Sequence, residues 1–376
     1  MALSDARTEG RLAVAVIGGG YGGFAAAKPL DEIADVTLVE PRDAFVHNVA
    51  ALRALVEPEW LERIFLPYDH LLANGRVIRD RAVEVDVGRV MLGSGVELTP
   101  DFIVLATGST YPYPAKTGTD ETATAIRRYR GSHDELGRAG RVLIVGAGPT
   151  GLELAGEISD RWPEKAITIV EAHPDILVGP YSQDLRDEVR RQLENRGVEL
   201  VLGEPLSAEP ESSPVAFGSF AVSTTAGRTI EAEIWFRCYG LTPVSDYLGG
   251  ELAGARLADG SVAVTPELLV RGQTSVFALG DVAAADLKTA GRAGREADVV
   301  SANIRALVEG GELRAYEPSP PAILIPLGPS GGASQLSGQD EIAGAEKTAA
   351  MKGEHLFVDN YRERFGLAAS APIAAG

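Results

Sequence analysis

The fold is decided by Leu12-Ala-Val-Ala-Val-Ile-Gly-Gly-Gly-Tyr-Gly-Gly-Phe-Ala-Ala-Ala-Lys28. Its first six residues are all apolar, which is typical of a strand buried on both faces of a parallel sheet. Glycines in the spacing Gly-x-Gly-x-x-Gly follow at once, and the alanines after them favour a helix. A second apolar run, Asp35–Glu40, ends in an acid. This order predicts a strand-helix-strand unit that binds a dinucleotide.

The three glycines of this first motif have separate tasks. Gly18 permits the tight turn, Gly20 lets the backbone approach a pyrophosphate, and Gly23 lets the helix pack on the strand. The phosphates are expected at the helix N-terminus, where free N–H groups favour anions. Glu40 lies 22 residues after Gly18, where a carboxylate can accept hydrogen bonds from ribose hydroxyls.

The same unit recurs 128 residues later. Its strand is 141–145, and its glycines are Gly146, Gly148 and Gly151. Glu171 ends the following strand, and an acid at this position repels a 2′-phosphate, which favours NADH over NADPH. NADPH stays open as a donor because His173 lies close by.

Two dinucleotide sites in one chain indicate electron transfer between a nicotinamide and a flavin. Ala106-Thr107-Gly108 follows an apolar strand and resembles the turn by which two-dinucleotide flavoproteins cross from the flavin domain to the nicotinamide domain. Residues 237–240 resemble the return crossover. Residues 277–281 end in Gly280-Asp281 and resemble a second flavin motif, whose Asp binds the ribityl chain.

The chain is therefore predicted to be an α/β protein with two Rossmann-like dinucleotide-binding domains and a small C-terminal α+β domain. A cluster of prolines near residue 320 marks the start of the last part. The predicted boundaries are 1–112 for the first part of the FAD-binding domain, 113–237 for the NAD(P)H-binding domain, 238–316 for the second part of the FAD-binding domain, and 317–376 for the C-terminal domain.

Composition excludes several classes of function. The 376 residues carry a formal charge of −18, which argues against nucleic acid and anionic membranes as partners. The single cysteine, Cys238, permits no disulfide and no cysteine-based metal site, and no metal is predicted. The sequence shows no secretory signal and no membrane-spanning run, and Ala2 stands where myristoylation needs a glycine. We therefore expect a cytoplasmic protein with at most peripheral membrane contact.

Further segments of the chain resemble a known protein family. Asp43–Glu57 and Leu105–Thr110 are similar to segments of the ferroptosis-suppressor family, which comprises apoptosis-inducing-factor-like relatives of type II NADH:quinone oxidoreductases. The resemblance extends from Val14 to about Phe357. It implies a glutathione-reductase-type fold, non-covalent FAD, NAD(P)H as donor and a quinone-like acceptor. The cysteine pair of dithiol reductases is absent.

The resemblance also implies roles for individual residues. Glu157, Lys352 and Phe357 match positions that matter for quinone reduction. The resemblance implies that Glu157 relays a proton or guides the nicotinamide, that Lys352 binds a quinone carbonyl, and that Phe357 stacks on the quinone ring. His47 and Asn48 match flavin-side residues, and Asn48 is also predicted to be a helix N-cap. Lys288 precedes a helix whose N-terminus is expected to face the flavin. Arg292 and Glu296 depart from the family, which usually has less charged residues there.

Other interpretations stay open. Glu157 is alternatively a solvated surface charge, His47 a structural residue, and Lys352 with Phe357 a surface lysine beside a core ring. The chain is alternatively a reductase of a ferredoxin- or rubredoxin-type protein, a flavoprotein monooxygenase, or an NADH-sensing module with negligible turnover. Its oligomeric state is predicted only as monomer or homodimer.

Overall fold

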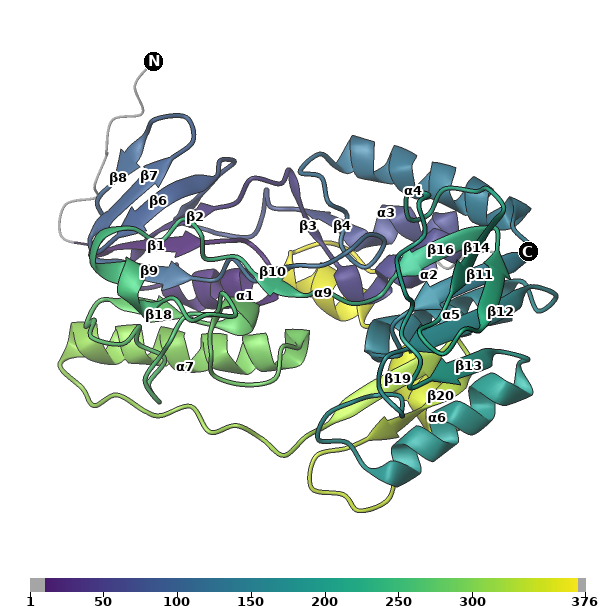
Figure 1. The fold of residues 1–376 in the computed structure, drawn as a ribbon. Coiled ribbons are helices and arrows are strands. Elements are labelled where there is room, and N and C mark those ends of the chain that lie inside the picture. Colours follow the sequence, from purple (N-terminus) through teal and green to yellow (C-terminus); the bar gives the residue numbers. More distant parts are fainter. Residues whose placement is uncertain (1–10, 371–376) are drawn as a thin grey trace.

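The computed structural model describes residues 11–370 and is built around two parallel sheets that lie side by side (Figure 1). The first sheet has the order β18-β9-β1-β2-β5, and all of its neighbouring strands are parallel. Its strands are β1 (Ala13–Ile17), β2 (Asp35–Val39), β5 (Arg76–Ile78), β9 (Phe102–Leu105) and β18 (Val276–Ala278). Since β18 follows the second sheet in the chain, the first unit is assembled from two separate segments.

Helices and smaller sheets surround the first sheet. Helix α1 packs against α7, and both lie against one face of the sheet (Figure 1). The helices beside the first sheet are α1 (Tyr21–Leu30) and α7 (Ala290–Glu309), with helical turns at Gly250–Ala255 and Gly280–Val282. Helices α2 (Ala51–Val56) and α3 (Leu61–Ile64), with the turns Asn48–Ala50 and Pro58–Trp60, extend away from this sheet and pack on the second unit (Figure 1). The antiparallel strands of the first unit are β3 (Ala44–Val46), β4 (Phe65–Pro67), β6 (Ala82–Asp86), β7 (Arg89–Leu92) and β8 (Glu97–Leu98).

The second sheet repeats the same plan with the order β13-β12-β11-β16. Its parallel strands are β11 (Arg141–Val145), β12 (Ala166–Glu171), β13 (Glu199–Leu202) and β16 (Ile234–Arg237), beside the hairpin β14 (Phe220–Ser223) and β15 (Thr229–Ala232). Its helices are α4 (Thr122–Arg138), α5 (Pro149–Arg161) and α6 (Gln183–Asn195). The chain passes between the two units at β10 (Ser109–Thr110) and β17 (Thr242–Pro243), which pair with each other.

The C-terminal segment packs against the second unit (Figure 1). It consists of the hairpin β19 (Ile323–Leu327) and β20 (Gly331–Gln335), helix α8 (Ala345–Thr348), a π-helical turn (Ala349–Gly353) and helix α9 (Val358–Arg364). The hairpin lies on α5 and α6. The start of this segment therefore rests on the second unit, while its last helix reaches back to the first (Figure 1).

Local sequence explains the boundaries of the long helices. Ser182 Oγ accepts a hydrogen bond from the Leu185 amide at 3.3 Å and caps the start of α6. The α6 stripe of Leu185, Val189 and Leu193 is buried. One cap prediction is wrong: a helical turn begins at Asn48 itself, and the Asn48 side chain caps nothing. Its oxygen Oδ1 is buried and has no protein partner.

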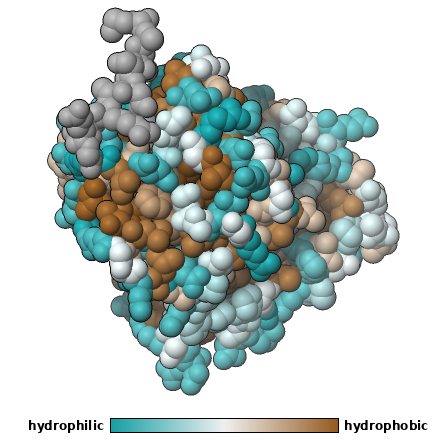
Figure 2. Space-filling model, turned by 90° about the vertical axis from the view of Figure 1, so that its left-hand side faces the viewer, coloured by the Kyte–Doolittle hydropathy of each residue, from teal (hydrophilic) through white to brown (hydrophobic). Residues whose placement is uncertain are grey.

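No helix within residues 11–370 combines the length and the apolar character needed to cross a bilayer. Figure 2 shows the end of the molecule that carries β6–β8, where apolar and hydrophilic residues alternate over the surface. The predictions about myristoylation and a secretory signal concern residues 1–10, which lie outside the described part of the chain. The described part also contains no cluster of three or more acidic, histidine or cysteine side chains placed to hold a metal ion.

Candidate active site

Two connected hollows run along the carboxyl ends of the first sheet's strands and into the space between the units. The larger has a volume of about 840 Å³ and is lined by Gly18, Glu40 and Arg42 among others. The smaller has a volume of about 340 Å³ and lies where the first unit, the second unit and the C-terminal segment meet. We call the first the nucleotide cleft and the second the central pocket. Arg42, Thr107 and Lys116 line both, so the two form one continuous site.

The first glycine turn has the shape of a phosphate cradle. Gly18 has a φ of +102°, and a Cβ there would lie 2.5 Å from the carbonyl oxygen of Ala106. A Cβ on Gly23 would overlap the carbonyl oxygen of Gly18. A Cβ on Gly20, by contrast, would meet no protein atom within 4 Å. Gly20 therefore faces open space at the N-terminus of α1, where a pyrophosphate fits.

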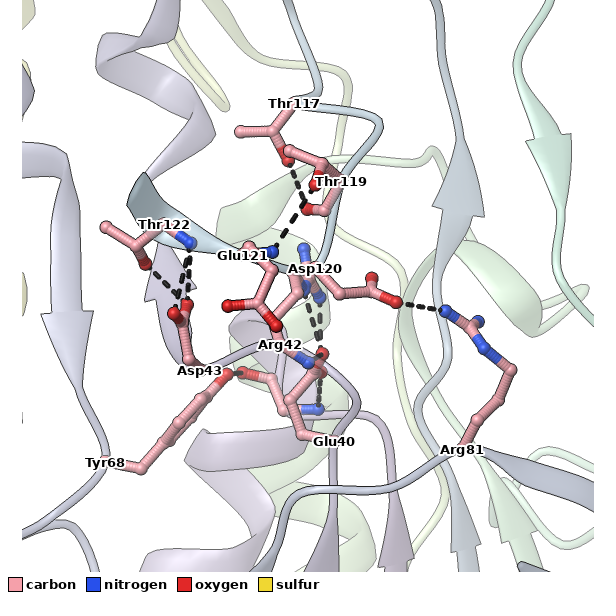
Figure 3. A network of polar contacts seen from close by, with 11 residues as sticks. Glu40, Arg42, Asp43, Tyr68, Arg81, Thr117, Thr119, Asp120, Glu121 and Thr122 are labelled. Carbon is pink, nitrogen blue, oxygen red and sulfur yellow. Dashed lines mark hydrogen bonds and ion pairs between the residues drawn. The ribbon is translucent and has the colours of Figure 1, made fainter. Parts of the chain in front are cut away.

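Glu40 stands at the end of β2 and joins this turn to the nucleotide cleft (Figure 3). Its Oε2 accepts a hydrogen bond from the Gly19 amide at 2.7 Å, and its Oε1 accepts from Arg42 Nε at 2.8 Å. Burial by itself raises the pKa of Glu40, but the charge and hydrogen bonds of Arg42 lower the pKa overall. Glu40 is thus an ionised acceptor beside the cradle, as ribose binding requires.

The connection between the units crosses the nucleotide cleft beside Glu40 (Figure 3). Residues 117–120 line the cleft, and Asp120 forms an ion pair at 2.7 Å with Arg81, which immediately precedes β6. The Asp43 carboxylate accepts a hydrogen bond from the Thr122 amide at 2.9 Å and thereby caps α4. Sequence reasoning missed these contacts, because the partners are far apart in the chain.

The second glycine turn repeats the geometry of the first. Gly146 has a φ of +108°, a Cβ on Gly151 would overlap the Gly146 carbonyl oxygen, and Gly148 faces open space. Glu171 Oε2 accepts a hydrogen bond from the Ala147 amide at 2.7 Å, as Glu40 does from Gly19. In both turns, therefore, a carboxylate accepts a hydrogen bond from the glycine-rich loop. The second turn is suited to bind a second dinucleotide.

Replacing the open glycine of each turn is expected to separate the two cofactors. Gly148→Ala leaves the protein folded but raises the KM for NADH about tenfold, roughly 1.4 kcal/mol, because the methyl group occupies the approach of the pyrophosphate. Gly20→Ala acts on FAD affinity by the same mechanism. Steady-state kinetics and flavin content per chain measure the two effects. A Gly148→Ala protein that loses FAD instead of NADH affinity would contradict the assignment.

One wall of the central pocket comes from the first unit. Gly108, Asp281 and the α7 N-terminus at Thr289 and Ala290 line it. Lys288 Nζ donates to the Asp281 carbonyl oxygen at 2.5 Å. The Asp281 side chain is held in place by a hydrogen bond, since its Oδ2 accepts from Ser109 Oγ at 2.5 Å. A helix N-terminus and a lysine at this wall favour negative charge on a bound ring.

Helix α5, on the opposite side of the pocket, carries two acids whose surroundings differ. Glu153 lines the central pocket and binds Lys352 Nζ through Oε1 at 2.8 Å, while Lys352 also donates to the Leu324 carbonyl oxygen at 3.1 Å. Glu157, one turn further on, does not line the pocket and is 3% exposed. The interpretation of Glu157 as a solvated surface charge is therefore wrong.

Glu157 forms a buried, two-point ion pair with Arg53 of α2. Arg53 Nε contacts Oε2, and Arg53 Nη2 donates to Oε1 at 3.0 Å. Burial raises the pKa of Glu157 to about 7 even though the Arg53 charge lowers it. Burial also raises the pKa of Glu153 against the lowering effect of Lys352. Glu153 is the pocket carboxylate that sequence reasoning missed, although its i, i+4 spacing from Glu157 was a usable signal.

The remaining predicted residues lie at different depths. Asn48 lines the central pocket with Phe45 and Val49. His47 is fully buried behind this wall and does not line it. Phe357 is half-buried and is also absent from the lining. The structure therefore brings Asn48, Lys288 and Lys352 together and places Glu157, His47 and Phe357 behind or beside them.

The two residues that depart from the resembled family brace the first wall from behind. Glu296 Oε2 accepts a hydrogen bond from the Gly280 amide at 2.5 Å, and burial raises the pKa of Glu296 to about 7. Arg292 forms a buried ion pair with Asp286 and donates to the Ser319 carbonyl oxygen at 3.1 Å. Both charges are therefore satisfied within the protein, and neither residue lines the pocket.

Two glycine turns of the same geometry, each hydrogen-bonded to an acid, precede helices α1 and α5, and the first residues of both helices line one shared pocket. This arrangement defines a class: oxidoreductases that hold FAD and a nicotinamide dinucleotide on paired Rossmann-like units. The chain belongs to the pyridine nucleotide-disulphide oxidoreductase family, whose sequence model matches residues 12–297. FAD and NAD(P)H are accordingly its cofactors.

Individual relatives sharpen this assignment. Apoptosis-inducing factor homolog B of Dictyostelium discoideum is 31% identical over 94% of this chain and 97% of that protein. Ferroptosis suppressor protein 1 of Taeniopygia guttata is 32% identical over 93% of this chain and 95% of that protein. The structure of the sulfide:quinone oxidoreductase of Aquifex aeolicus has a TM-score of 0.74 at 17% identity, covers 95% of this chain and 92% of that one, and shares the fold. The resemblance predicted from the sequence is confirmed.

Proposed function

We propose that this oxidoreductase transfers electrons from NADH, by way of FAD, to a quinone-like acceptor in the central pocket. The balanced reaction is NADH + H⁺ + quinone → NAD⁺ + hydroquinone. One observation carries the proposal: Lys352 and apolar side chains such as Phe45, Val49 and Leu52 line the same pocket as Gly108 and Asp281. An apolar pocket with few polar groups suits a flat, weakly polar ring.

The residues of the chain would divide the work in this pocket. Bound FAD supplies the acceptance of hydride and the release of two electrons. Lys288 and the α7 N-terminus stabilise negative charge at one wall. At the other wall the Lys352 ammonium has three N–H donors, two of which are directed to Glu153 and Leu324, so the third can orient an acceptor carbonyl. The raised pKa of Glu153 favours holding a proton beside that lysine.

An acceptor screen tests this function. The holoenzyme is reduced anaerobically with NADH and mixed in a stopped-flow instrument with menadione, a ubiquinone analogue, ferredoxin or O₂. Rapid flavin reoxidation by the two quinones supports the proposal. Reoxidation only by ferredoxin would instead support a reductase of a small redox protein, and substrate-coupled O₂ consumption a monooxygenase. Failure of every acceptor would leave an NADH-sensing module.

Lys352→Met is expected to slow the reaction with the quinone acceptor selectively. It keeps the length of the side chain but removes a charged donor, so kcat/KM for menadione falls about tenfold or more. Lys347→Met on α8 is the matched control, because Lys347 is exposed and does not line the pocket. Equal rates for both variants would remove Lys352 from the site, and a fall in NADH-driven flavin reduction alone would move it to the donor side.

Finer features belong to the same proposal. NADH is preferred over NADPH because Glu171 at the end of β12 repels a 2′-phosphate. The enzyme acts in the cytoplasm, meets quinone by peripheral membrane contact at most, and works as a monomer or homodimer. The boundaries 1–112, 113–237, 238–316 and 317–376 separate its functional parts. Glu157 and Phe357 support the acceptor side from behind the pocket lining.

A further inference from the structure

The C-terminal segment contains an unusual turn four residues after Lys352. Leu356 has a φ of +46° and Phe357 a φ of +60°, so two successive non-glycine residues occupy the left-handed region. Side chains disfavour this conformation, and it persists only where the surroundings enforce it. The Leu356 amide donates to the Lys352 carbonyl oxygen at 2.7 Å, which links the turn directly to the pocket lysine. Something must hold this turn in place.

His47 provides that hold from the other end of the chain. Its Nε2 lies 2.6 Å from the Leu356 carbonyl oxygen, and its Nδ1 lies 3.1 Å from the Tyr21 hydroxyl. A carbonyl oxygen can only accept, so Nε2 carries the hydrogen and Nδ1 accepts from Tyr21. Tyr21 in turn accepts from the Val49 amide at 3.1 Å. Both ring nitrogens are therefore used, and the tautomer is fixed.

Burial keeps this histidine uncharged. The His47 ring is fully buried and packs 4.6 Å, centroid to centroid, from the Tyr361 ring of α9. Burial, together with the nearby Lys352 charge, lowers the pKa of His47 to about 4 although the Leu356 carbonyl opposes the shift. The hydrogen bond to Leu356 therefore persists unchanged across the neutral pH range.

A second attachment runs parallel to the first. Arg53 Nη2 donates to the Gly353 carbonyl oxygen at 3.1 Å. Residues 47–53 thus hold the 352–357 segment at two carbonyl groups that lie about 300 residues away in the chain. Tyr21 and Val49 both line the central pocket, so the hydrogen-bonded chain leads from the pocket wall through His47 to the turn.

We propose that His47 is a positioning residue that fastens the Leu356–Phe357 turn to the FAD-binding unit and thereby sets Lys352 at the acceptor wall of the central pocket. His47 itself does not line the pocket, but it contacts the wall residue Tyr21. The functional consequence for the acceptor rests on the proposed function, whereas the fastening of the turn does not. Of the two roles that the sequence leaves open for His47, flavin contact and structural support, this proposal favours the second.

Hydrogen–deuterium exchange of the holoenzyme tests the fastening, with peptides covering residues 349–358. Glutamine places an N–H near the position of Nε2, whereas asparagine reproduces only Nδ1. We expect amides of this segment to exchange about tenfold faster in His47→Ala and His47→Asn, because the Leu356 carbonyl loses its donor. His47→Gln is expected to remain within about threefold of wild type.

The matched variants keep the proposal falsifiable if His47→Ala does not fold. His47→Gln and His47→Asn then decide it. Tyr21→Phe removes the Nδ1 partner and the acceptor of the Val49 amide but leaves the Nε2 contact with Leu356, so exchange at 353–358 is expected to stay near the wild-type rate. Wild-type exchange in His47→Asn, or equally fast exchange in the glutamine and asparagine variants, would overturn the proposal.

Kinetics then separate this inference from the proposed function. The KM for menadione is expected to rise about tenfold in His47→Asn and to recover in His47→Gln, in parallel with the exchange data. If wild-type enzyme is not reoxidised by quinones, the proposed function fails while the exchange pattern still decides the role of His47. If quinones reoxidise the wild-type enzyme but the KM for menadione is equal in all variants, the contact between His47 and the turn does not position Lys352. That result would overturn the proposal.

Discussion

Arg53→Leu is expected to lower the free energy of unfolding by about 3–5 kcal/mol, the usual cost of removing one partner from a buried ion pair. Arg53 is 2% exposed and Glu157 is 3% exposed, so the carboxylate left behind has no access to solvent. The Gly353 carbonyl oxygen loses its donor in the same variant. Urea unfolding followed by tryptophan fluorescence measures the loss.

The loss should depend on pH in a definite direction. The pKa of Glu157 in the folded protein is about 7, above the ordinary value of 4.5. The folded state therefore binds more protons than the unfolded state between these values, and stability falls as pH rises from about 4.5 to 7. Without Arg53 the lowering influence disappears, and the pKa of Glu157 rises further. The destabilisation should accordingly be greater at about pH 8 than at about pH 6.

Two controls isolate the buried pair. The double variant Arg53→Leu/Glu157→Leu is expected to regain most of the loss, because apolar residues replace both charges. Arg79→Leu breaks the exposed pair with Glu121 and is expected to change stability little. An Arg53→Leu protein as stable as wild type at about pH 8 would mean that Glu157 reaches solvent.

Local patterns were enough to predict most of the secondary structure around the cofactors. The strand at 141–145 has the predicted boundaries and the next strand ends at Glu171 as predicted, because each apolar run stops at a glycine or an acid. The 20-residue helix α7 and the capped helix α6 follow from signals contained within a few residues. Glycine turns are predictable for the same reason, since their function resides in backbone shape.

Contacts between distant segments could not be predicted in this way. Glu153 and Glu157 lie one turn apart on α5, and the sequence does not say which of them faces the pocket. The answer depends on Arg53 and Lys352, which lie 104 and 199 residues from their partners. The resemblance places His47 on the flavin side, with a structural role as the alternative. Its hydrogen bonds to Tyr21 and to the Leu356 carbonyl oxygen depend on packing that only the tertiary structure determines.

Gly156→Ala is expected to lower the free energy of unfolding by about 3 kcal/mol and to raise the KM for menadione as well. Gly156 lies in the interior of α5, where helix propensity alone favours alanine by about 1 kcal/mol. A Cβ there would overlap Leu327 Cα and lie 2.9 Å from the Leu327 carbonyl carbon, both part of the β19 backbone. A backbone cannot rotate aside as a side chain can, so β19 must move off the helix.

Movement of β19 has a specific consequence for the central pocket. Leu324 lies on this strand, and its carbonyl oxygen accepts the second hydrogen bond of Lys352. A shifted strand therefore frees Lys352, and the KM for menadione should rise together with the loss of stability. Gly131→Ala on α4 is the matched control: Gly131 is exposed, a Cβ there meets no atom within 4 Å, and stability should rise by up to about 1 kcal/mol. If both substitutions stabilise the protein alike, the close approach of β19 to α5 does not exist in solution, and the C-terminal wall of the pocket must be held by His47 and Arg53 alone.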